Sequence, residues 1–145
     1  MRLTDVATGR VTRTLEGHAH HALSVAWQDD GRTVASAGAD QSVKIRNSET
    51  GETLQTITGF PQEATSIKFV PSTNQVIASS GSGQVKLADT SNAKVIRNFD
   101  AAKDFLFSIA LTPDGKTLVA GGESGIVRIW KLADAAVIAE LKSEK

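Results

Sequence analysis

Three histidines close together near the start of the chain are the first residues that could do chemistry. His18, His20 and His21 are the only histidines among the 145 residues, and imidazole is a common metal ligand. The chain contains no cysteine, and no carboxylate stands at a spacing from these histidines that is typical of a zinc site. Three imidazoles in one short loop rarely converge on a single ion, so we expect no metal site and no cofactor.

His18 also combines with a serine and an aspartate, Ser36 and Asp40, in a set of residue types that could form a catalytic triad. A nucleophilic serine must be accessible beside its base, and it often stands in a Gly-x-Ser-x-Gly turn. The alternation around Ser36 (TVASAG) instead predicts a strand packed between neighbouring sheets. The GSG run at 81–83 is too short for a phosphate-binding loop. Because the carboxylates are scattered over turns, we expect no catalytic residues and a protein that is not an enzyme.

The charge balance and the length of the apolar runs exclude other classes of partner. Sixteen basic residues balance sixteen acidic ones, and no segment concentrates one sign, so the basic face that nucleic-acid binding requires is missing. The longest apolar runs have the length of a strand, well below the roughly 18 residues of a membrane helix. Residues 1–10 contain no apolar stretch after the arginine and do not resemble a signal peptide. We therefore expect a cytoplasmic protein that binds neither nucleic acid nor membranes.

The elements that must position these residues follow from a repeat with a period of 42 residues, which aligns the chain from end to end without a gap. Serine recurs with this step, and so do apolar residues at several positions. The recurring sets are Ser24, Ser66 and Ser108; Leu15, Ile57, Phe99 and Leu141; and Trp27, Phe69 and Leu111. We infer that each repeat is one packing unit.

Each repeat contains four short runs with the period-two alternation of β-strands, separated by turn residues. In the first full repeat these runs are 22–27, 33–38, 42–47 and 53–58. The first 15 residues contain only two runs, which align with the third and fourth strands of the later repeats. The tail from Ala133 onward has a helix-forming composition, but its match to the earlier fourth strands outweighs that preference.

A four-stranded unit that recurs about every 40 residues resembles the WD40 family of β-propellers. That family carries a Gly-His pair before the innermost strand, an Asp between the second and third strands, and Trp-Asp at the end of the third. The first full repeat has Gly17-His18, Ser36 and Asp40 at such positions, with Arg46-Asn47 in place of Trp-Asp. The third repeat has Trp130 but continues with lysine. The resemblance implies a structural network of His18, Ser36, Asp40 and Trp130.

The remaining repeats match this pattern less closely. At the positions of His, Ser, Asp and Trp the second repeat has Phe60, Ala78, Ser82 and Ala88, and the third has Ala102, Ala120 and Ser124 before its Trp130. No repeat has the complete network. Packing between repeats must therefore supply most of the stability.

The sequence thus predicts an all-β protein of four-stranded antiparallel propeller blades. It comprises three full blades and the two outer strands of another, which is about half of a propeller. The single domain spans residues 1–145, divided into 1–15 (partial blade), 22–58, 65–99 and 107–141. Open blade faces favour self-association or a place within a larger propeller.

The resemblance implies a non-catalytic scaffold for protein or peptide partners. Two alternatives remain open, namely a propeller segment of a larger multidomain enzyme or redox protein, and a structural, oligomer-forming fragment. Candidate partner-binding residues are His20 and His21, which we expect to be exposed, and the aromatic loop residues Phe60 and Phe105. Phe107 alternates with Ile109, so we expect its ring to lie in the core.

Overall fold

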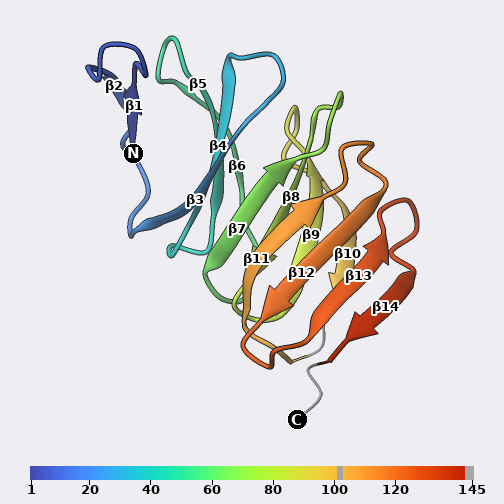
Figure 1. Cartoon of the computed structure of the whole chain (residues 1–145). Coiled ribbons are helices and arrows are strands. Elements are labelled where there is room, and N and C mark those ends of the chain that lie inside the picture. The colour runs from blue at the N-terminus through green and yellow to red at the C-terminus, as the bar shows by residue number, and fades with distance from the viewer. Residues whose placement is uncertain (101–102, 143–145) are drawn as a thin grey trace.

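The computed structural model describes residues 1–100 and 103–142, and within these residues it consists of strands and turns without a helix (Figure 1). The strands form three four-stranded antiparallel sheets and one two-stranded sheet. This confirms the all-β fold class. The sheets stand side by side along the chain and do not close into a ring, as expected for part of a propeller.

The two-stranded sheet, called here the half-blade, contains β1 (Arg2–Thr4) and β2 (Val11–Thr14). Blade 1 contains β3 (Ala22–Trp27), β4 (Thr33–Gly38), β5 (Val43–Asn47) and β6 (Thr53–Ile57). Blade 2 contains β7 (Ala64–Phe69), β8 (Gln75–Ser80), β9 (Gln84–Asp89) and β10 (Val95–Asp100). Blade 3 contains β11 (Leu106–Leu111), β12 (Thr117–Gly122), β13 (Val127–Lys131) and β14 (Val137–Leu141). Within each blade every strand pairs with its neighbours in sequence.

Short turns built on aspartate and glycine set the register of the hairpins. Between β3 and β4, the Asp30 carboxylate accepts hydrogen bonds from the backbone N–H groups of Arg32 and Thr33 and from the Thr33 hydroxyl. Gly31 follows with φ of 68°, a conformation that a Cβ atom disfavours. At this hairpin the local sequence therefore fixes where β4 begins.

The first strand of every blade contains a register shift near its start, and this shift corrects one expectation. The pairing of β11 with β12 shifts between Leu106 and Ser108. Because a bulge breaks the period-two alternation, Leu106 and Ile109 are both buried and Phe107 between them is 59% exposed. The prediction that the Phe107 ring lies in the core is wrong. Equivalent shifts occur in β3 and β7.

The hydrophobic core lies between blades. One cluster fills the space between blades 1 and 2 and includes Ile45, Ile67 and Phe69. A second cluster fills the space between blades 2 and 3 and includes Leu87 and Trp130, whose indole meets the Phe99 ring edge-to-face at 6.3 Å. Each blade thus depends on its neighbours for burial, as in other repeat architectures.

Candidate functional site

A buried chain of hydrogen bonds joins the loop before β3 to β4, to β5 and to the turn between these two strands. His18 Nδ1 lies 2.9 Å from each carboxylate oxygen of Asp40, and His18 Nε2 lies 2.8 Å from Ser36 Oγ. Arg46 Nη1 donates to the same Ser36 Oγ at 2.7 Å. The Asp40 carboxylate can only accept, so we assign the Nδ1–H of His18 to Asp40. With Nδ1 as the donor, Nε2 is assigned as the acceptor of the Ser36 proton, while Ser36 Oγ accepts from Arg46.

The Asp40 carboxylate is held in its ionised form. Burial opposes ionisation, but hydrogen bonds from the Ser42 hydroxyl, the Ala19 backbone N–H and His18 outweigh it and lower the pKa of Asp40 to about 2. Asp40 therefore anchors the loop at His18 with a charge-assisted contact. Ser36 is fully buried, so its hydroxyl is not accessible to a substrate as the nucleophile of a catalytic triad must be.

Arg46 stands where the resemblance places tryptophan. Its side chain is almost fully buried, and besides Ser36 it donates from Nη2 to the backbone carbonyl of Glu16 at 3.1 Å. Its Nε has no hydrogen-bond partner among the described residues. Burial lowers the pKa of Arg46, and the nearby Asp40 charge opposes this shift. The guanidinium replaces the indole as donor to Ser36, but at the cost of an unsatisfied buried N–H.

Blade 2 fills the equivalent place with an aromatic ring. Phe60, at the position of His18, is only 4% exposed and belongs to the core cluster between blades 1 and 2. The Lys86 ammonium lies 5.0 Å from the centre of the Phe60 ring and donates to the carbonyl of Gly59. Burial lowers the pKa of Lys86. Phe60 is thus part of the packing and is not offered to a partner.

Blade 3 uses a reversed set of polar groups. Ala102, at the histidine position, lies outside the described residues. Asp104 accepts from the backbone N–H and the hydroxyl of Ser124 at 3.0 and 2.6 Å, and from Arg128 Nη1 at 3.4 Å. Burial opposes ionisation of Asp104, yet the bonds from Ser124 and the Arg128 charge lower its pKa. Here the carboxylate comes from the loop and the hydroxyl from the turn, whereas in blade 1 the loop supplies the His18 imidazole and the turn supplies the Asp40 carboxylate.

Two segments of the chain match a known protein family. The WD40 family model, described as the WD domain, G-beta repeat, matches residues 9–47 and 93–131, which together are more than half of the chain. The chain belongs to the WD40 family. Both matched segments run from the end of one blade to the third strand of the next, and they start 84 residues apart, which is two repeats. A comparison with curated protein sequences gave no match.

The repeat that the family model does not match is the one that departs most from the WD40 pattern. The unmatched repeat between the two segments has none of the four pattern residues, and Phe60, Ala78, Ser82 and Ala88 stand in their places. The two matched repeats keep parts of the WD40 pattern, namely His18, Ser36 and Asp40 in the first and Trp130 in the last. Trp130 lies in blade 3, at the position that Arg46 holds in blade 1. It therefore does not join His18, Ser36 and Asp40 of the first repeat in one network. It packs on Phe99 instead.

The other candidate residues lie at the surface or near it. His20 and His21 are exposed in the loop before β3, and Phe105 is half-buried. The Phe105 ring stacks at a tilt on Phe107, with ring centres 5.0 Å apart, and covers Gly81 so closely that a Cβ there would lie 2.6 Å from the ring. Among residues 1–100 and 103–142, no group of three or more His, Cys, Asp or Glu side chains is placed to hold a metal ion. The described chain likewise contains no helix long and apolar enough to cross a membrane.

The two ends of the stack carry apolar side chains that the interior blades bury. Val25 is 51% exposed, whereas Ile67 and Ile109, at the same repeat position, are 0% and 2% exposed. At the other end Leu141 is 56% exposed, whereas its equivalent Phe99 is fully buried. Trp27 joins Val25 on β3, because its equivalent Phe69 is buried. Val137 joins Leu141 on β14 and is 58% exposed, whereas its equivalent Val95 is half-buried. We call these sets the β3 face and the β14 face.

Sequence reasoning did not find Arg46, Asp104 or Arg128 as network members. Arg46 stands two repeats before Trp130, so its repeat position could have predicted that it takes part in the network. Asp104 lies two residues beyond the histidine position, and only the fold brings it to Ser124 and Arg128.

Proposed function

We propose that the chain is a non-catalytic WD40 scaffold that holds protein partners on its open blade faces, and that other copies of the chain are among these partners. The observation that carries the proposal is the exposure of Val25 and Leu141 at positions that are buried between interior blades. Burying one such side chain contributes about 2 kcal/mol, and contiguous exposed apolar surface is typical of an interaction site. The polar residues of the His18 network bond to one another, which favours a structural over a catalytic role.

The repeat indicates how two copies would meet. Within the chain, Ser24 Oγ of blade 1 accepts from the Ile67 N–H of blade 2 at 3.2 Å, and Ser66 Oγ of blade 2 accepts from the Ile109 N–H of blade 3 at 3.4 Å. Ser108 is the third serine of this set and is exposed. In a head-to-tail contact the matching donor is the backbone N–H of Val25 in the next copy. Such a contact is heterologous and can close into a ring.

The half-blade limits this arrangement. It stands beside the outer part of blade 1, where Arg13 Nη1 donates to the Thr50 carbonyl at 3.1 Å and Leu15 is buried (Figure 1). A complete blade fits against the β3 face only if β1 and β2 move aside, and Leu141 of the partner would then take the place of its repeat equivalent Leu15. A two-stranded hairpin is marginally stable by itself, so displacing it costs little free energy. A partner that brings only two inner strands fits with the half-blade in place.

Light scattering across a dilution series tests the proposal. We expect a mass that is a multiple of 15.3 kDa and falls toward that value on dilution. A constant mass of 15.3 kDa together with cooperative unfolding would contradict self-association. A monomer that binds apolar dyes or aggregates would also contradict it, and would assign the open faces to blades that another polypeptide segment supplies.

A further inference from the structure

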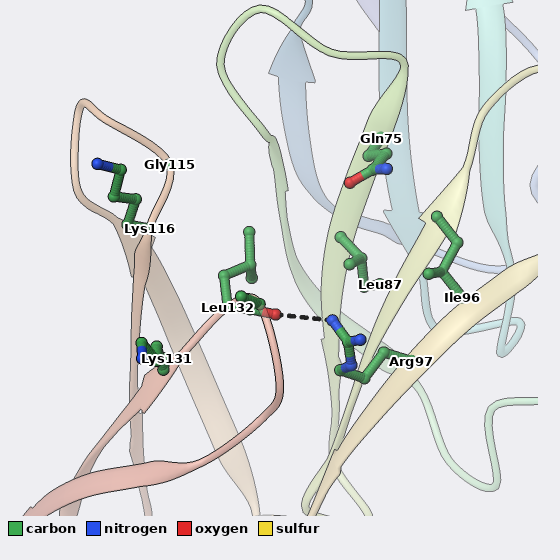
Figure 2. Close-up of a pocket in the computed structure, with 9 residues that line it drawn as sticks. Gln75, Leu87, Ile96, Arg97, Gly115, Lys116, Lys131 and Leu132 are labelled. Carbon is green, nitrogen blue, oxygen red and sulfur yellow. Dashed lines mark hydrogen bonds between the residues drawn. The ribbon is translucent and has the colours of Figure 1, made fainter.

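A pocket between blades 2 and 3 combines an apolar floor with basic side chains (Figure 2). It has a volume of about 370 Å³, and Leu87, Ile96 and Leu132 provide its apolar lining. Leu87 and Leu132 are buried in the inter-blade core, whereas Ile96 is exposed. The volume lies within the range of about 300–1,000 Å³ that ligand pockets occupy. Both blades are complete in the chain, so this pocket does not depend on the open blade faces.

Three cations line the same pocket. Arg97 comes from blade 2, and Lys116 and Lys131 come from blade 3. Arg97 Nη1 donates to the Leu132 carbonyl at 3.0 Å, which fixes its guanidinium across the boundary between the blades (Figure 2). In the part of the chain that the structure describes, none of the three cations has a carboxylate within 4.0 Å.

The carboxylates adjacent in sequence are used within their own turns. Asp114 accepts from the Thr112 hydroxyl and the Lys116 backbone N–H, and Asp134 accepts from the Ala136 N–H. Neither carboxylate lines the pocket. Gly115, with φ of 66°, allows this turn to approach blade 2, because a Cβ there would lie 3.3 Å from Val70 and Pro71.

The neighbouring boundary provides an internal comparison. One repeat earlier, between blades 1 and 2, the residues equivalent to Arg97, Lys116 and Lys131 are Gln55, Asn74 and Asp89. Gln55 donates to the Ser91 carbonyl at 2.9 Å, and Asn74 accepts from Gln28 at 3.0 Å. Packing of one blade on the next therefore does not require the three cations. At the boundary between the half-blade and blade 1 the equivalents are Arg13, Arg32 and Asn47, so the complete set of three cations occurs only between blades 2 and 3.

From this charge and shape we propose that the pocket binds an acidic peptide segment of a partner protein, with one aliphatic side chain on Leu87, Ile96 and Leu132 and flanking carboxylates on Arg97, Lys116 and Lys131. The aliphatic group fills the apolar floor, and the carboxylates supply the negative charge that the rim lacks. A purely apolar ligand would leave the cations unpaired, and a purely ionic one would leave Ile96 exposed.

The test uses the full chain and a fluorescein-labelled peptide, Glu-Asp-Leu-Asp-Glu, acetylated and amidated at its ends. Fluorescence anisotropy should show saturable binding that weakens with salt. The R97Q/K116N/K131D variant carries the side chains of the neighbouring boundary and keeps a donor for the Leu132 carbonyl, so we expect it to fold and to bind at least tenfold more weakly. K68D/K103D, a change of two exposed lysines outside the pocket that lowers the net charge by the same four units, is the matched control and should leave the affinity within twofold.

Two results would overturn the inference. The first is equal affinity of the wild type and the R97Q/K116N/K131D variant. The second is equal affinity for a peptide with serine in place of leucine, because binding would then not use the apolar floor. The mass in solution should be the same for wild type and variant, so failure here leaves the open-face proposal intact.

Discussion

Individual polar residues hold the loop before β3 to blade 1, and their energetics differ between Asp40 and Arg46. Asp40 accepts three kinds of donor and is stabilised as an anion, whereas Arg46 is a buried cation with an unpartnered Nε. A well-satisfied anion contributes to stability, while a partly satisfied buried cation can cost more than it contributes.

Replacement of Asp40 by asparagine should change how stability depends on pH. The folded-state pKa of Asp40 is lowered from 3.8 to about 2, so its stabilisation is complete above the unfolded-state pKa and is lost as the pH falls from about 4 to about 2. We expect the advantage of wild type over Asp40→Asn in unfolding free energy to be about 2 kcal/mol larger at pH 6 than at pH 1. Urea unfolding at several pH values measures this. A difference that is independent of pH would contradict the assignment of Asp40 as a stabilised anion.

Replacement of Arg46 by tryptophan should stabilise the protein. The indole N–H can donate to Ser36 as Arg46 does, and the change removes a buried charge and its unpartnered Nε. Trp130 shows that the fold accommodates an indole at the equivalent position of blade 3. We expect a gain of about 1 kcal/mol in the free energy of unfolding, measured by urea titration at pH 7. A loss of similar size would show that the bond from Arg46 to the Glu16 carbonyl outweighs the cost of the buried charge.

At the scale of the blade, the serine at one repeat position makes the same hydrogen bond in each blade that is followed by another blade. Ser24 and Ser66 accept from a backbone N–H of the following blade, and Ser108 has no such blade within the chain. The serine position is therefore a connector between blades.

The two serines Ser66 and Ser108 form a matched pair for a test of this connection. Ser66→Ala leaves the buried Ile109 N–H without an acceptor, so we expect a loss of about 1–2 kcal/mol in unfolding free energy. Ser108→Ala removes an exposed hydroxyl and should leave the unfolding of the isolated chain unchanged, while it weakens self-association. Chemical unfolding of dilute samples and light scattering of concentrated ones measure the two effects. Equal destabilisation by both substitutions would contradict the connector role.

Elements were more predictable from the sequence than the contacts between side chains. The repeat placed Leu15, Ile57 and Phe99 at one buried position, because each blade repeats the same packing. The expectation for Phe107 failed because alternation does not reveal a bulge. The Asp104–Arg128 pair could not be predicted, since a loop residue two places out of register supplies the carboxylate. The burial of Phe60 follows from its repeat position, which is that of His18.

At the scale of the whole molecule, the chain is a short stack of blades with two unlike ends. The β3 face and the β14 face are the two sides of a blade boundary, and Val25 and Leu141 are exposed because no blade covers them within the chain. Complementary ends on one molecule favour head-to-tail contacts between copies. The pocket at the boundary of blades 2 and 3 adds a separate surface for an acidic partner.

Mixing two variants, each with one face blocked, tests the open-face account most directly. Val25→Lys places a charge on the β3 face and Leu141→Lys places one on the β14 face, and the change of the almost fully exposed Val6 to lysine is the control. Light scattering should show each face variant alone as a monomer and their equimolar mixture as a dimer, because only the mixture contains one intact copy of each face that can meet. The Val6→Lys chain should associate like wild type. A mixture that stays monomeric while wild type associates, or face variants that associate as wild type does, would contradict the account.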